Sequence, residues 1–478
     1  MRAEGQQQLV EPAPFASVTD LRPGIRAHAL GEWVVIATLT VLVVLNAWML
    51  GGDSWRFRPS SFDTSGSLGW IAEFADLRWD PGLLRGGVML AGVLVLVAAA
   101  VLMSRGSLPR FALVGLAAVV VATILVPAVL LQVSLRDASG PWFFTNDSSF
   151  QTEIAGDLLL DGENPYGHDY TGTELERFYS LDGSLDAEAQ QEVQLQHFPY
   201  FPGTTLTGAL WAGLPAPWDD FRLFVVLVSL AGFAVGLAFP GPLPWRVALG
   251  AFLAANPLAV FGAWFGTSQA PALVLVALAF ALLARRHLAW AAAALALAVL
   301  MRQFALVAVP FFGLAMLQLG GAAPLRRAAA VFGGILAAGL APFLLWDAGA
   351  FWGDTIEYGG ETYPIVGHGL AGLLVQLGIV ERRGAYPFAA LAVLLWLPAT
   401  IWLLSQQRKS RSLWAAAAGF SISIFALLYL GRVFQSIYLV WPLTGLALAA
   451  YLGAYESLEQ SEAGSEPQER PSASSLAA

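Results

Sequence analysis

The sequence predicts an all-α fold, a polytopic bundle of membrane-spanning helices, and two observations support that class. Hydrophobic residues make up 57% of the 478-residue chain, and charged residues make up only 12%. A soluble domain carries roughly 25% charged residues, so this chain needs a bilayer as the solvent for its apolar surface. In addition, uncharged runs such as 87–104 and 111–134 are long enough to cross a hydrocarbon layer of about 30 Å.

Hydropathy along the chain predicts about twelve spans. Two shorter apolar runs, 203–214 and 365–379, are predicted to be helices that lie on the membrane surface or re-enter it. The transmembrane domain therefore covers 31–454, between an N-terminal segment at 1–30 and a tail at 455–478 whose composition predicts disorder. The predicted spans are, in order, 31–51, 84–104, 110–134, 220–239, 246–265, 269–284, 287–301, 303–318, 328–346, 386–404, 412–431 and 434–454.

Arginine and lysine recur in alternate short turns between these spans, and the positive-inside rule assigns those turns to the cytoplasm. Both termini then face the cytoplasm, whereas 52–83, a first outer loop at 135–219 and a second outer loop at 347–385 face outward. Arg382 and Arg383 also fall on the outer side, against the bias of the rule. The cytoplasmic turns carry Arg105, Arg110, Arg246, Arg285, Arg286, Arg326, Arg327, Arg408, Lys409 and Arg411.

The distribution of charge limits the classes of function. Ion-coupled transporters usually keep acidic or histidine side chains inside the bundle, because a transported charge needs a partner there. Here the ionisable residues gather at the outer ends of helices and in the outer loops, which favours an enzyme at the membrane surface over a pump. The net charge of -9 argues against a nucleic-acid partner. The chain has no cysteine, which excludes a disulfide framework and a thiolate metal site.

Asp147 is the first candidate catalytic residue, because it follows an apolar span in the first outer loop. A carboxylate at that depth can be partly desolvated, which raises its pKa and makes it a better general base. The alternative is a structural role, since Asn, Asp and Ser at 146–148 are all favourable N-cap residues for the helix that follows. The spacing alone leaves both roles open.

Three further residues follow Asp147 within the same acidic stretch. Glu153 lies four residues before Asp157, so the two share a helical face that either binds sugar hydroxyls or is simply solvated. Asn164 and Tyr166 flank a proline in a Gly-x-Asn-Pro-Tyr turn. Their side chains are candidates for substrate binding.

Two arginines are placed at the outer boundary of the membrane by the span count. Arg302 lies midway between two cytoplasmic arginine pairs, and Arg432 lies between the last two spans. A guanidinium group there can form a two-pronged contact with a lipid phosphate. The alternative is an arginine that only extends towards the headgroups.

His368 lies in the glycine-rich part of the second outer loop, where it either transfers a proton or has a structural role. The outer histidines are too scattered to form a metal-ligand pattern. The chain also has no recognisable nucleotide-binding motif. The residues therefore predict neither a metal nor a cofactor.

Four motifs occur in chain order after the outer-loop aspartate. They are Leu-Leu-x-Asp-Gly-x-Asn-Pro-Tyr at 158–166, His-Phe-Pro-Tyr-Phe-Pro at 197–202, Met-Arg-Gln at 301–303, and Gly-Arg-x-x-Gln-x-x-Tyr-x-x-Trp-Pro at 431–442. Together they resemble the GT-C superfamily of integral-membrane glycosyltransferases, and within it the actinobacterial enzymes that take mannose from a polyprenyl-phosphate carrier. Gln269 stands where that family commonly has an aspartate.

The resemblance implies a GT-C-like architecture and a bacterial plasma-membrane enzyme whose active site faces the extracytoplasmic side. Its partners would be a polyprenyl-phosphate-linked sugar, a glycolipid or glycan acceptor, and the lipid bilayer. The alternatives are a flippase for lipid-linked sugars and a non-catalytic protein of envelope assembly. The candidate catalytic residues are Asp147 and His368, and the candidate substrate-binding residues are Glu153, Asn164, Tyr166, His197, Arg302, Gln303, Arg432 and Tyr438.

Overall fold

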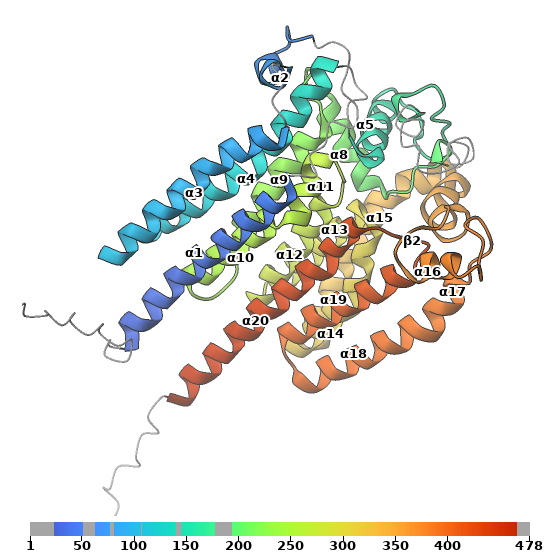
Figure 1. Cartoon of the computed structure of the whole chain (residues 1–478). Helices are drawn as coiled ribbons and strands as arrows, with labels where there is room; N and C mark the ends of the chain where they lie inside the picture. The colour runs from blue at the N-terminus through green and yellow to red at the C-terminus, as the bar shows by residue number, and fades with distance from the viewer. Residues whose placement is uncertain are drawn as a thin grey trace, which may run out of the picture.

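Long helices that run along one common direction form the body of the protein in the computed structural model (Figure 1). The structure describes residues 23–50, 63–76, 81–106, 108–139, 145–176 and 194–465. The α-helices are α1 (Pro23–Met49), α2 (Gly69–Asp76), α3 (Pro81–Arg105), α4 (Arg110–Ser139), α5 (Asp147–Leu160), α8 (Pro202–Ala212), α9 (Phe221–Leu237), α10 (Leu243–Ala255), α11 (Pro257–Phe265), α12 (Ala270–Ala284), α13 (Leu288–Met301), α14 (Val309–Gly320), α15 (Ala322–Trp352), α16 (Leu370–Gln376), α17 (Phe388–Leu391), α18 (Leu397–Ser410), α19 (Leu413–Leu430) and α20 (Val440–Ser465).

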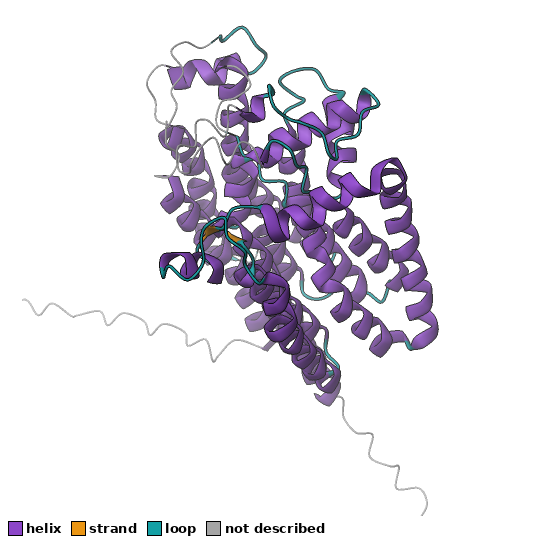
Figure 2. Cartoon of the chain, turned by 90° about the vertical axis from the view of Figure 1, so that its right-hand side faces the viewer, coloured by secondary structure: helices purple, strands orange, loops and turns teal. Residues whose placement is uncertain are grey.

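Shorter elements of other types connect several of these helices. The 3-10 helix η3 (Gln303–Ala308) precedes α14, and η6 (Ser436–Leu439) precedes α20. Two π-helices, η4 (Gly353–Thr362) and η5 (Ala392–Trp396), follow α15 and α17. The predicted all-α class is therefore confirmed, with a small addition. Two-residue strands, β1 (Val366–Gly367) and β2 (Val433–Phe434), pair in parallel and appear in orange in Figure 2.

Each of the twelve predicted spans coincides with helical structure. Nine of the helical segments in the described part are long and apolar enough to cross a membrane, which is three fewer than predicted. The other three segments are the shorter helices α9, α12 and α13. The 14 residues of α13 rise about 21 Å, which is less than the roughly 30 Å of a hydrocarbon layer. The protein is therefore a multi-pass helical membrane protein in which some helices are too short to span the layer alone.

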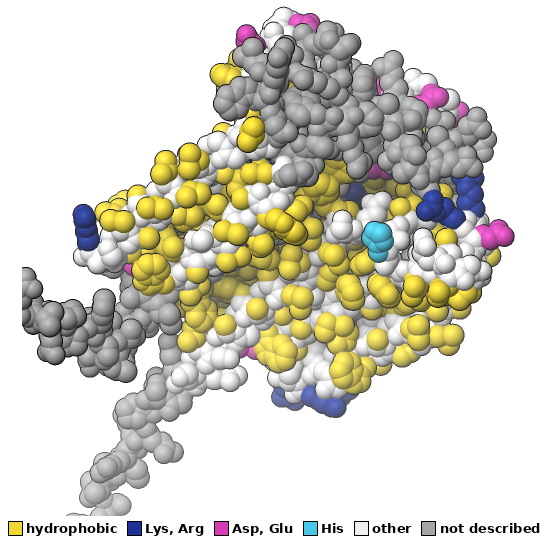
Figure 3. All heavy atoms as spheres, viewed as in Figure 1, with side chains coloured by type: hydrophobic (Ala, Val, Ile, Leu, Met, Phe, Trp, Pro, Cys, Tyr) yellow, Lys and Arg dark blue, Asp and Glu magenta, His cyan; other side chains and the backbone are white. Residues whose placement is uncertain are grey.

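The outer surface of the bundle suits a lipid environment. Exposed large hydrophobic side chains include Val41 on α1, Leu94 on α3 and Trp402 on α18. Figure 3 shows hydrophobic side chains covering the middle of one face, over α1, α3, α18 and α20. Such a face would be unfavourable in water, and it is the surface expected of a protein whose solvent is the acyl chains.

The helices bury two large apolar cores. One core joins α1, α3, α4, α10 and α11, and it includes Leu39 and Val129. The other joins α5, α12, α13, α14, α15, α19 and α20, and it includes Phe280 and Phe312, whose ring centroids are 4.4 Å apart. The first two spans, α1 and α3, thus pack on one flank of the bundle, against α4 and α10.

Several helices break or continue at positions that hydropathy does not reveal. The predicted span 246–265 is divided into α10 and α11 at Asn256, whose side chain caps α11 by accepting from the amide of Ala259 at 3.0 Å. The backbone of α15 kinks at Asp347. The tail predicted to be disordered from 455 is helical as far as Ser465, where α20 ends. Glu456, within that stretch, accepts a hydrogen bond from the amide of Leu413 at 2.7 Å.

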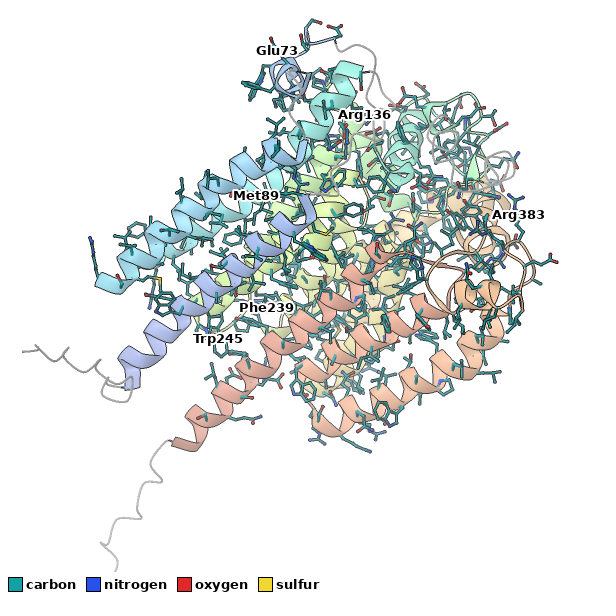
Figure 4. All side chains as sticks on the ribbon, viewed as in Figure 1. Glu73, Met89, Arg136, Phe239, Trp245 and Arg383 are labelled. Carbon is teal, nitrogen blue, oxygen red and sulfur yellow. The ribbon has the colours of Figure 1, made fainter. Side chains whose placement is uncertain are left out.

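A buried ionic network joins α4, α5 and α9 at one end of the bundle. The guanidinium of Arg136 makes two bonds to the carboxylate of Glu153, at 2.9 and 2.7 Å, and a third to Asp220 at 3.1 Å. Asp220 also binds the side chain of Arg222 at 2.6 and 2.9 Å, and it caps α9 by accepting from the amide of that residue. Figure 4 labels Arg136 between α4 and α5. The network fixes α5 against the spanning helices.

Replacing Asp220 with alanine is expected to destabilise the protein by about 3–5 kcal/mol, because the buried Arg222 would lose its carboxylate partner and Arg136 would lose one of the two carboxylates to which it donates hydrogen bonds. Burial alone raises the pKa of Asp220, but attraction to Arg222 and Arg136 outweighs it and holds the pKa well below its usual range. The stabilisation is therefore present above the unfolded-state pKa of about 3.9 and is lost as the pH falls towards the folded-state value. Thermal unfolding in detergent at pH 7 and pH 3 measures both effects. A variant that unfolds at the wild-type temperature at pH 7 would contradict this role.

Candidate functional site

A large cavity lies where the loop segments 194–201 and 355–376 meet the ends of the long apolar helices. Its volume is about 1310 Å³, and its lining comes from the start of α5, the 194–201 loop, the turn before α12, η3, the 355–376 segment and the 427–438 segment. Part of the lining comes from loops and turns, whereas Leu306, Pro310, Phe388, Trp396 and Leu427 belong to candidate membrane-spanning segments. The cavity therefore borders both loop segments and helices that are apolar enough to cross a membrane.

The short helices α12 and α13 each have one end at the cavity. Gln269 immediately precedes α12, Arg302 immediately follows α13, and both line the cavity. Gln269 accepts a hydrogen bond from the indole of Trp441 at 2.7 Å.

Asp147 lies at the first position of α5, half-buried in the cavity wall. The N-cap is its neighbour Asn146, whose side chain accepts from the amide of Ser148 at 3.1 Å. The N-cap position therefore belongs to Asn146, although Oδ1 of Asp147 accepts from the same Ser148 amide at 2.9 Å. A carboxylate at this end of a helix is stabilised by the partial positive charge of the exposed amides.

The start of α5 is fixed to the turn that precedes α12. The amide of Asn146 donates to the carbonyl of Phe265 at 2.6 Å, and the hydroxyl of Ser149 donates to the carbonyl of Gly266 at 2.6 Å. Gly266 has a φ of 91°, and a Cβ there would lie 2.5 Å from the Ser149 hydroxyl. Only glycine both adopts this positive φ and leaves room for the Ser149 hydroxyl. Gly266 therefore allows the turn to approach the start of α5, where Asp147 lies.

Arg302 is buried, with 8% of its surface exposed, and its guanidinium is held in one orientation. Its Nη2 donates to the hydroxyl of Ser268 at 2.5 Å, and its Cζ lies 3.8 Å from the centre of the Tyr200 ring. Because the aromatic ring covers one face of the guanidinium, the group can contact a ligand through the N–H groups at its edge. A guanidinium held in this way can bind an anionic group through its remaining N–H groups.

Asp147 and Arg302 line the same cavity, together with Tyr200. Burial raises the pKa of the Tyr200 phenol, Arg302 lowers it, and Asp147 raises it again. The structure brings together the two residues predicted to act as base and phosphate ligand.

Arg432 and His368 belong to another wall of the cavity. The Nε of Arg432 donates to the carbonyl of Tyr363 at 2.7 Å, which ties the second outer loop to the 431–438 segment. The β1–β2 pair joins the same two segments, and Gly367 is required there because a Cβ would overlap the carbonyl of Phe434. His368 follows at once, exposed and lining the cavity.

Gln303 and Tyr438 also line the cavity, as substrate-binding candidates should. Gln303 donates to the carbonyl of Pro199 at 2.9 Å, which supports the loop that carries Tyr200. Tyr438 packs edge-to-face on Phe304, with ring centroids 5.7 Å apart.

Four other candidates lie outside the lining and support it instead. Glu153 is part of the ionic network described above. The side chain of Asn164 accepts from the amide of Tyr166 at 3.2 Å, and the hydroxyl of Tyr166 donates to the carbonyl of Tyr200 at 2.8 Å. These contacts hold the 164–166 turn and the Tyr200 loop together. Their predicted contact with substrate stays a prediction.

His197, the fourth of these candidates, pairs with Asp354 of η4 through its Nδ1 at 2.8 Å. The imidazole also stacks on Tyr358, with centroids 4.5 Å apart. Asp354 further accepts from the amides of Gly167 and Phe198 at 2.8 and 3.1 Å. This carboxylate therefore fixes three outer segments to one another and forms the support behind the cavity wall.

No protein-family model matches this chain. No curated protein and no solved structure matches it either. The assignment of function therefore depends on the residues of the cavity.

Three residues that line or support the cavity were not among the candidates from the sequence, although each lies in or beside a feature that the sequence shows. Tyr200 lies within the 197–202 motif, Ser268 lies in the turn where Gln269 was singled out, and Arg382 was noted only because it opposed the positive-inside rule. All three roles depend on contacts across the fold. In the described residues, no group of three or more His, Asp or Glu side chains is placed to hold a metal ion.

Proposed function

We propose that the protein is a glycosyltransferase that moves a sugar, by resemblance mannose, from a polyprenyl-phosphate carrier to an acceptor on the outer face of a bacterial plasma membrane. One observation carries the proposal. A single cavity combines a positioned carboxylate, a buried and oriented arginine, and walls formed by membrane-spanning segments. A ligand that is both anionic and lipid-linked matches those three properties together.

The chemistry follows from the positions of Asp147 and Arg302. The acceptor hydroxyl attacks the anomeric carbon, so a bond from the acceptor oxygen to that carbon forms while the bond from the carbon to the phosphate oxygen breaks. Asp147 receives the acceptor proton, which contributes typically 10²–10⁴-fold in rate. Arg302 stabilises the charge that develops on the departing phosphate. One such displacement inverts the anomeric centre.

A donor-release assay tests the proposal. The full-length protein in vesicles that contain a polyprenyl-phosphate-linked mannose and envelope lipids is expected to release polyprenyl phosphate and to transfer the sugar to a membrane component. Mass spectrometry of the extracted lipids measures both products. Movement of intact donor between leaflets without any transfer would contradict the proposal and would indicate a flippase.

The proposed orientation predicts which cysteine variants react in intact cells. The native chain has no cysteine, so a single introduced thiol gives a clean signal. Thr171→Cys, an exposed position before the 194–201 loop, is expected to react with a membrane-impermeant maleimide. Ser410→Cys, exposed at the end of α18, is expected to react only after permeabilisation. The reverse pattern would place the cavity on the cytoplasmic side.

A further inference from the structure

Gln269 lines the cavity but has no part in the chemistry proposed above. Only 4% of its surface is exposed, and its Oε1 accepts a hydrogen bond from the indole of Trp441 at 2.7 Å. Because an indole nitrogen can only donate, this bond assigns the amide oxygen to Trp441 and turns the amide nitrogen away from it. That nitrogen makes no hydrogen bond within the described residues, and it is not sealed in the core. Gln269 therefore offers two N–H groups to a ligand.

Two cavities border Gln269, and only one of them has room for a substrate. The smaller cavity lies beside α12 and has a volume of about 30 Å³, which is enough for about two water molecules. The larger is the cavity of about 1310 Å³ that Arg302 also lines. A substrate group that reaches the Gln269 amide therefore lies in the larger cavity, together with Arg302.

Gln269 also stands at the start of α12, a helix of 15 residues. The first amides of such a helix carry a partial positive charge of about half an elementary charge, which attracts anions. At the neighbouring start of α5, the side chains of Asn146 and Asp147 both accept from the amide of Ser148. No side chain of the described residues caps α12 in that way. Its positive end is therefore not neutralised by a cap.

Arg302 lies against the turn that precedes α12. Its Nε donates to the carbonyl of Ser268 at 3.3 Å, and its Nη2 donates to the hydroxyl of the same residue at 2.5 Å. The guanidinium is thus fixed to the residue directly before Gln269. A carboxylate at 269 would pair with this arginine and cap α12, whereas the neutral amide of glutamine adds N–H donors to the positive charge. The turn therefore combines a guanidinium, an amide and a helix end, and all three favour an anion.

We propose, on the basis of the function proposed above, that the Gln269 amide and the start of α12 bind the donor phosphate together with Arg302. In the donor, this phosphate is a diester with one negative charge. It gains a second charge as its bond to the anomeric carbon breaks and the electrons of that bond stay on the phosphate oxygen. N–H groups fixed in advance by Trp441 stabilise this charge without having to reorient. Gln269 is therefore a further residue of the donor site.

Binding of the sugar-free carrier tests this site without any transfer. Full-length wild type and variants are titrated in detergent with undecaprenyl phosphate, undecaprenol or inorganic phosphate, and bound ligand is measured by native mass spectrometry. Gln269→Met removes the N–H donors without adding a charge, and it is expected to bind undecaprenyl phosphate about tenfold more weakly. Gln269→Glu keeps the acceptor for Trp441 but adds a negative charge, and it is expected to bind about 100-fold more weakly. Both should bind undecaprenol, which has no phosphate, as tightly as wild type.

Gln406→Glu is the matched control for the added charge. Gln406 is half-buried on α18 and does not line the cavity. Its variant makes the same chemical change as Gln269→Glu and should bind both lipids like wild type. An equal loss of undecaprenyl phosphate in the two glutamate variants would indicate a general effect of charge and would overturn the inference.

Three further outcomes would also overturn it. Wild-type affinity of Gln269→Met for undecaprenyl phosphate would show that the amide does not contact the phosphate. Equal loss of undecaprenyl phosphate and undecaprenol would indicate a defect in the fold or in binding of the carrier chain. Inorganic phosphate bound as tightly as undecaprenyl phosphate would assign the site to a free anion.

The site and the proposed function can fail separately. Active transfer by wild type, with unchanged carrier binding and transfer in Gln269→Met, would refute the Gln269 site and leave the glycosyltransferase proposal intact. Carrier binding that depends on Gln269 as expected, without any transfer by wild type, would support the phosphate site and refute the proposed function instead.

Discussion

Replacing Asp147 with asparagine is expected to lower turnover by about 100-fold or more, while the protein stays folded and still binds its donor. The substitution keeps the size of the side chain but removes the group that accepts the proton. It also spares the helix, because Asn146 supplies the N-cap of α5. Single-turnover kinetics with a polyprenyl-phosphate-linked sugar measure the effect on the chemical step.

Asp157→Asn is the matched control for this experiment. Asp157 lies on the same helix, is exposed, and does not line the cavity. Its variant makes the same chemical change and should keep near-normal turnover. If Asp147→Asn is equally active, the base is another group, and His368, which lines the cavity, becomes the next candidate.

Replacing Arg302 with lysine is expected to lower turnover by about 10²–10³-fold, which is typical for the loss of one donor to a developing charge. An ammonium group keeps the charge. However, it cannot retain both the stacking on Tyr200 and the bond to Ser268 that orient the side chain. The loss should appear in kcat as well as in donor affinity, because the phosphate gains charge as the sugar departs.

Arg326→Lys provides the control, since Arg326 is exposed at the start of α15 and does not line the cavity. It should leave turnover unchanged. Wild-type kinetics for Arg302→Lys would show that a point charge is enough there, and would remove the proposed phosphate contact at this residue.

The helices were largely predictable from sequence, and the physical reason is that membrane spans need long apolar runs. All twelve predicted segments are helical. The same reasoning could not reveal which helices are interrupted. The break at Asn256 depends on a side-chain cap. Hydropathy reports the total apolar content of a segment, which is insensitive to such a break. The short helices α12 and α13 match the predicted runs 269–284 and 287–301.

The site was predictable only in part, because the sequence shows which groups are ionisable but not what they touch. Asp147 and Arg302 were singled out from their expected depth, and the structure places both at the cavity. Glu153 was singled out on similar grounds, yet it is half-buried and paired with Arg136. Only the fold separates a carboxylate committed to an ion pair from one that lines a cavity, since the partner is 17 residues away in sequence.

The most direct test of the central claim is the glycolipid profile of cells that carry the wild-type gene, no gene, or the Asp147→Asn variant. Mass spectrometry of extracted envelope lipids measures the masses of all three sets. The proposed function predicts that deletion removes a glycolipid, that a species lighter by one hexose accumulates, and that Asp147→Asn reproduces the deletion although the protein is present in the membrane. Identical profiles of envelope lipids and glycans in all three strains would contradict it.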